Sequence, residues 1–166
     1  MRRYIIALVL IVAAAARPGA QTPDPIAGDL QKDWADQKAR MTALADAMPE
    51  DKYGFKATEA QRTFGEQLHH LAEAHVRMFR ALDASGKIPA PEVAAAKTKD
   101  EIVKALAAAY DYGQAVLAAQ GSLGESAGTR SKARVVWAAM NNAMNHYGQC
   151  VVYLRLNGIV PPASRR

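Results

Sequence analysis

Residues 131–158 read SKARVVWAAMNNAMNHYGQCVVYLRLNG. Apolar side chains recur in this stretch at the spacing of one helix face. They are Val136, Met140, Ala143, Tyr147, Cys150, Val151 and Leu154. Gly158 stands where a left-handed residue ends a helix, and the prolines that follow cannot continue one. We therefore predict a long helix from about Ser131 to Asn157.

This helix also carries an unusual run of carboxamides around a single histidine, His146. Because positions i, i+3 and i+4 share a helix face, Asn142 and Gln149 lie on the same side as His146. Burying such groups costs roughly 1–3 kcal/mol each unless they find partners. Together with His69 and His70 upstream, the pattern suggests a polar site inside a helical bundle.

Three more helices are predicted upstream: one from Pro25 to Met48, one from Thr63 to Leu82, and one opened by a capping box at Thr98–Glu101. Their apolar stripes are Ile26, Leu30, Trp34, Met41, Leu44 and Met48; Phe64, Leu68, Leu71, Phe79 and Leu82; and Ile102, Leu106, Tyr110, Val116 and Leu117. No alternating β-branched run appears. We expect an all-α, antiparallel four-helix bundle, in which connections 49–62 and 85–97 are long enough to cross over. A Gly/Ser loop is expected at residues 121–128.

The first twenty residues have the pattern of a secretory signal. A basic start, Met1–Arg3, precedes an uncharged apolar stretch at residues 4–16, and small residues lead to Ala20. The apolar core is too short for a membrane span of about 20 residues. We predict a signal peptide at residues 1–20, with Ala14–Ala16 as a second cleavage site, and one domain at residues 21–166. An uncleaved anchor is the alternative; otherwise the protein is periplasmic or secreted.

The charge of the chain limits the classes of partner that we expect, and its cysteine content limits the disulfides. Removing the three arginines of the leader lowers the formal charge from +5 to +2. Without a Lys/Arg cluster interleaved with aromatics, nucleic acid is not an expected partner, and membrane contact is expected only through the signal peptide. A homodimer stays open. Cys150 is the sole cysteine, so an internal disulfide is excluded, and its apolar neighbours favour a buried, inert thiol.

The histidines of the second predicted helix differ in position. His75 lies near the centre of the apolar stripe, His70 lies to one side, and His69 points away and is expected to be exposed. His75 is then either a hydrogen-bonded core histidine or a third polar group of the same cavity. Glu66 and Glu73, one turn either side of His70, could orient its ring, supply an oxygen ligand, or be solvated helix charges.

Two blocks of sequence resemble the DinB/YfiT-like family of metalloenzymes, and specifically its small exported branch. The first block is KYGFKAT at residues 52–58 with RTFGEQLHHLA at 62–72. It is similar to the aromatic loop and the R-T-F-G-x-x-L-x-H-L-A helix start of that branch. The second is HYGQ at 146–149, YLR at 153–155 and GIVPP at 158–162, which is similar to its H-Y-G-N…Y-L-R…G-I-V-P-P ending.

The resemblance implies a four-helix bundle with a divalent metal, zinc or nickel, held by three histidines. One comes from the second helix and two from an H-x-x-x-H pair on the last. By position these are His70, Asn142 and His146, so the middle ligand is not histidine. The residue before His146, commonly glutamate in this branch, is Asn145. Because a carboxamide oxygen is a poor ligand for zinc or nickel, weak or absent metal binding is expected.

Three functions stay open. The first is a degenerate DinB-like protein that binds an unidentified small molecule with weak or no metal. The second is a divalent-metal-dependent enzyme, of transferase or hydrolase type, with Asn142, His75, a glutamate or water completing the ligand shell. The third is a structural or interaction module. No catalytic residue is identified, since no phosphate loop, HExxH, GxSxG or CxxC occurs.

Overall fold

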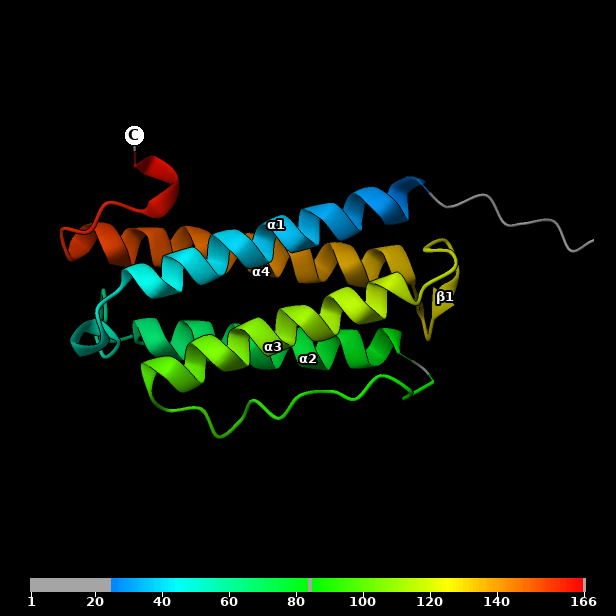
Figure 1. The fold of residues 1–166 in the computed structure, drawn as a ribbon, viewed down its shortest axis with the longest axis horizontal. Coiled ribbons are helices and arrows are strands. Elements are labelled where there is room, and N and C mark those ends of the chain that lie inside the picture. The colour runs from blue at the N-terminus through cyan, green and yellow to red at the C-terminus, as the bar shows by residue number, and fades with distance from the viewer. Residues whose placement is uncertain (1–24, 84, 166) are drawn as a thin grey trace, which may run out of the picture.

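A computed structural model of the chain describes residues 25–83 and 85–165. Four helices account for most of it: α1 (Pro25–Ala47), α2 (Phe64–Leu82), α3 (Lys99–Ala118) and α4 (Lys132–Leu156) (Figure 1). The predicted all-α four-helix bundle is confirmed, with helix ends within two residues of those expected. The predicted signal peptide lies outside the described residues. None of the helices described is long and apolar enough to cross a membrane.

The order of the helices departs from a purely antiparallel bundle. Both α1 and α2 pack against α3 and α4. The consecutive helices α1 and α2 therefore lie diagonally opposite each other in the bundle, and so do α3 and α4. Figure 1 shows α2 and α3 running in the same direction, opposite to α1 and α4. The linker from Asp83 to Thr98 therefore runs back along the outside of the bundle. A helix of about 30 Å, such as α3, is spanned by about ten extended residues at roughly 3.3 Å each. The linker contains more residues than this, so it is long enough to run the length of the bundle.

Short elements complete the connections. A 3-10 turn, η1 (Glu50–Lys52), follows α1, and a second, η2 (Pro162–Ser164), follows α4. Strands β1 (Ser126–Ala127) and β2 (Arg130–Ser131) pair antiparallel across the predicted Gly/Ser loop. Gly128 turns this hairpin with a φ of 64°, which favours glycine. The hairpin was not expected, because strands of two residues leave no periodic signal.

Side-chain caps fix where the helices begin. Thr98 and Glu101 form the expected capping box at α3, and Ser131 Oγ accepts the Arg134 amide at α4. A second capping box, Thr63 with Glu66, opens α2. Its sequence signal, threonine followed three residues later by glutamate, is the same as that at α3. These caps place the first turn of α2 a single turn before His70.

The centre of the core is built around Trp34, which is fully buried. Its indole lies 4.8 Å, between ring centroids, from each of His75, Phe79 and Tyr110, and its Nε1 donates to the Tyr110 carbonyl at 2.9 Å. The predicted stripes are largely buried, but Ile26 is 63% exposed. It lies in the first turn of α1, beyond the part of the helix that the aromatic core covers.

Candidate functional site

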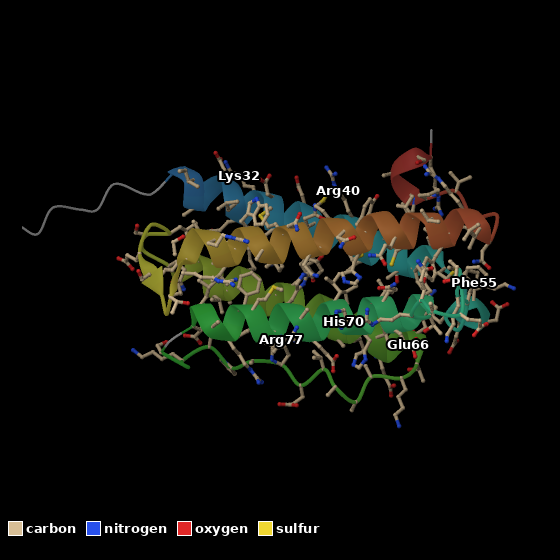
Figure 2. The ribbon with its side chains drawn as sticks, turned by 180° about the vertical axis from the view of Figure 1, so that it is seen from behind. Lys32, Arg40, Phe55, Glu66, His70 and Arg77 are labelled. Carbon is tan, nitrogen blue, oxygen red and sulfur yellow. The ribbon has the colours of Figure 1, made fainter. Side chains whose placement is uncertain are left out.

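The structure brings His70 of α2 and His146 of α4 together. Their ring centroids are 5.4 Å apart, with an angle of 54° between the ring planes. His70 lies midway along α2, on the face that Figure 2 shows beside α4. Metal–nitrogen bonds of about 2.1 Å require two ligand nitrogens to lie within about 4 Å of each other, which this ring spacing allows.

Both imidazoles are held neutral at physiological pH. Burial lowers the pKa of His146 to about 4, with smaller contributions from His70 and Arg62. Burial also lowers the pKa of His70, aided by the positive charges of Arg62 and Arg77. Nδ1 of His146 is buried and has no hydrogen-bond partner. A neutral imidazole offers one nitrogen lone pair and one N–H, so the pair can accept from and donate to a ligand.

Asn142 lies one turn before His146 on α4 and is half-buried. Its Oδ1 atom is buried without a hydrogen-bond partner. Within residues 25–83 and 85–165, no three His, Cys, Asp or Glu side chains converge on a point where a metal ion could be held. Two imidazoles and a carboxamide oxygen do not fit a tight zinc or nickel centre.

A chain of amides joins α2 to α4 beside the histidine pair. Gln67 Nε2 donates to Gln149 Oε1 at 3.0 Å, and Gln149 Nε2 donates to Asn145 Oδ1 at 3.0 Å. The side chains of Gln149 and Asn145 are therefore hydrogen-bonded to each other, and Gln149 also links α4 to α2. Sequence reasoning missed Gln67, although it lies three residues before His70 and so on a neighbouring part of the same face.

His70, but not His146, lines a polar depression of about 390 Å³ on the surface of α2, together with Arg62, Glu66, His69 and Glu73. The Glu66 carboxylate accepts the Thr63 amide at 2.7 Å, a hydrogen bond that lowers the pKa of Glu66. Glu66 is thus a helix cap. Glu73 is half-buried, and its charge acts to raise the pKa of His70 against the stronger effect of burial.

His69 does not point into solvent as expected. It is half-buried, and its Nε2 lies 2.8 Å from the carbonyl oxygen of Val93 in the linker between α2 and α3. The prediction was wrong because helix periodicity says nothing about an extended linker crossing the outer face of α2. His69 therefore fastens the linker to the helix that carries His70.

His75 is fully buried in the core, as its place in the stripe predicted. Its ring lies 4.8 Å from that of Trp34 and 4.9 Å from that of Tyr110, and neither ring nitrogen has a hydrogen-bond partner. Burial and then His146 lower the pKa of His75 to about 3. The backbone of Ala139 acts weakly in the opposite direction. His75 is thus a core histidine as expected, but it lacks the expected hydrogen bond and does not line the depression beside His70.

Cys150 also lies in the core and is fully buried. Burial raises the pKa of its thiol to about 12, so a thiolate does not form at neutral pH. The expectation of an inert cysteine agrees with this environment.

The two sequence blocks that carried the family resemblance meet in space. Tyr153 of α4 donates its hydroxyl to the Arg62 carbonyl at 2.6 Å, immediately before α2. Its ring centroid lies 5.9 Å from that of Phe55 and 6.3 Å from that of Phe64. Tyr153 therefore holds the start of α2, and with it Arg62, against the helix that carries His146.

Comparison with known proteins identifies the family to which this helical fold belongs. A search of curated proteins found no significant match. The family profile described as the DinB superfamily matches residues 33–150, which include all four helices in whole or in part and both histidines of the pair. The chain therefore belongs to the DinB superfamily.

Proposed function

We propose that this protein binds a small polar molecule at the His70–His146 pair, with weak or no divalent metal. The observation that carries the proposal is the buried, unpartnered Nδ1 of His146 next to His70. An unsatisfied buried polar atom is unfavourable by about 1–3 kcal/mol, so a ligand that supplies the missing partner gains binding energy there.

The chemistry of the site defines what such a ligand needs. It must hydrogen-bond to neutral imidazoles and can also donate to the unpartnered Oδ1 of Asn142. Arg62 adds a positive charge at the rim of the depression. These features favour a small, polar, uncharged or anionic molecule.

A metal-dependent enzyme is the second candidate, because the same Asn142 oxygen is available to a cation. Two imidazoles, this oxygen and water would give a weak ligand shell. The two candidates predict different affinities for a divalent metal. An enzyme that keeps its metal needs a Kd in the micromolar range or tighter, whereas the first proposal predicts a Kd only near the millimolar range.

Histidine side-chain NMR during titration with zinc or nickel tests this directly. We expect the His70 and His146 signals to move together only at millimolar metal, and a panel of small polar molecules to move the same two. His70→Gln should abolish the response of His146 to metal, while the control Lys87→Gln, at an exposed residue outside the depression, should preserve it. Micromolar metal binding would favour the enzyme, and a pair silent to every probe would refute the site.

A further inference from the structure

The outer face of α4 carries a row of exposed apolar side chains. Trp137, Met144, Val152 and Leu156 are each between 49% and 58% exposed. Their spacing of seven, eight and four residues keeps them on one side of the helix. Gly148, in the middle of the row, has no atom within 4 Å of where a Cβ would lie, so nothing in the described chain covers it. We call these four apolar residues the α4 stripe.

The charged side chains of α4 itself are all basic. After Glu125 the sequence contains six basic residues and no acidic one. Lys132 is paired with Glu125 at 2.6 Å, but Arg134 and Arg155 are exposed on α4 itself. The Arg134 guanidinium lies over the Trp137 ring, 4.5 Å from its centroid. The stripe is therefore an apolar surface with arginine near either end, and an anionic partner suits it.

A second copy of the chain suits it less well. Antiparallel pairing of two stripes would bring Arg134 of one copy within about a turn of Arg155 of the other, which is repulsive. A helix of 25 residues, about 37 Å long and roughly 10 Å wide, also offers about half of the ~800 Å² per partner that stable interfaces bury.

We propose that the α4 stripe docks on an anionic lipid surface. Tryptophan and arginine are favoured at such interfaces, where a helix lies in the plane with its apolar side immersed. On the neighbouring helix α1, exposed Asp29, Asp33 and Asp36 alternate with exposed Lys32 and Arg40, so the arginines of α4 supply the charge for docking. This contact through α4 is separate from the membrane contact that the signal peptide is expected to make.

The first turn of α1, which follows the leader in the sequence, lies at the Trp137 end of the stripe. The apolar, uncharged residues 4–16 precede α1, which begins at the end of the bundle where α4 also begins (Figure 1). Ile26, in the first turn of α1, is exposed at this end. During export, before the predicted cleavage, a leader held in the membrane would bring this end of the bundle toward the lipid.

Quenching of tryptophan fluorescence by brominated lipid tests the proposal on the full chain. Trp34 is fully buried, so quenching reports on Trp137. With vesicles of phosphatidylcholine containing roughly a quarter phosphatidylglycerol, we expect strong quenching that weakens at high salt, and little with phosphatidylcholine alone. Any binding through the leader is common to all variants and cancels between them.

Two variants separate the contributions of the stripe. Val152→Ser/Leu156→Ser removes apolar surface, and Arg134→Gln/Arg155→Gln removes charge; each should weaken vesicle binding roughly fivefold or more. The matched control Lys87→Gln/Lys104→Gln removes two exposed charges elsewhere and should bind like wild type. Equal quenching in all variants, or none with anionic vesicles, overturns the proposal. A concentration-dependent dimer that shields Trp137 overturns it in favour of a second copy.

Discussion

The imidazoles of His75 and His146 lie in surroundings that oppose their protonation. Burial lowers the pKa of His75 to about 3 and that of His146 to about 4, against about 6.5 for an unfolded histidine. Between these values the unfolded chain binds protons that the folded chain does not. The free energy of unfolding is therefore at its full value above pH 6.5 and falls as the pH drops toward 3.

Replacing His75 isolates its share of this acid sensitivity. His75→Phe keeps an aromatic ring against Trp34 and removes two unpartnered nitrogens. We expect stability at pH 7 to be unchanged or higher by about 1 kcal/mol. Between pH 6 and 4 the loss of stability should be shallower by up to about 1.4 kcal/mol per pH unit, the effect of one proton. Urea unfolding across this range measures it, and parallel pH curves would contradict the assignment.

At the scale of helices, α3 depends on Gly113 for its close approach to α1 and α2. A Cβ there would lie 2.8 Å from Phe79 Cε2 and 2.9 Å from two ring atoms of Trp34. Because Trp34 is the centre of the core, its ring cannot move aside freely. The packing of α3 therefore requires glycine at this position, while Gly148 on α4 faces open space.

The two glycines give a matched pair of substitutions. Gly113→Ala should lower the free energy of unfolding by about 1–3 kcal/mol through overpacking. Gly148→Ala should raise it by about 0.5–1 kcal/mol, because alanine loses less backbone entropy in a helix. Urea midpoints of both variants and wild type are the measurement. A neutral Gly113→Ala would show that the core is looser than described.

At the scale of the whole molecule, the sequence predicted the helices well because their signals are local. Caps such as Thr98, the stop at Gly158 and the 3.6-residue stripes each act within a few residues. The direction of α3 depends on how the linker packs, which no local pattern encodes. The same reason explains the error at His69, which the linker covers.

The candidate site was predictable in part. His70 and His146 were found through resemblance, whereas periodicity alone favoured His75. The structure places the first two together and His75 in the core, 4.8 Å from Trp34. The roles of Gln67 and Glu66 depend on partners contributed by helix packing and by the cap, so residue spacing alone could not assign them.

Export remains a prediction from the first twenty residues. We expect the protein recovered from its native compartment to begin near Gln21, because a basic start, an apolar core and small residues precede that position. Mass spectrometry of the N-terminus decides this. A cytosolic product that retains Met1 would contradict the prediction.

We propose that the His70–His146 pair binds metal only weakly because Asn142, rather than a third histidine, stands one turn before His146. Asn142→His would restore two imidazoles one turn apart on α4, with His70 facing them from α2. Asn141→His places the same side chain on an exposed neighbouring position and is the control. Calorimetric titration of wild type and both variants with zinc and nickel is the measurement.

We predict that Asn142→His binds either metal at least about a hundredfold more tightly than wild type, a difference of about 2.7 kcal/mol. Its melting temperature should rise with metal concentration, while the Asn141→His control should behave like wild type. Equal affinities in wild type and Asn142→His, whether both tight or both absent, would contradict the account.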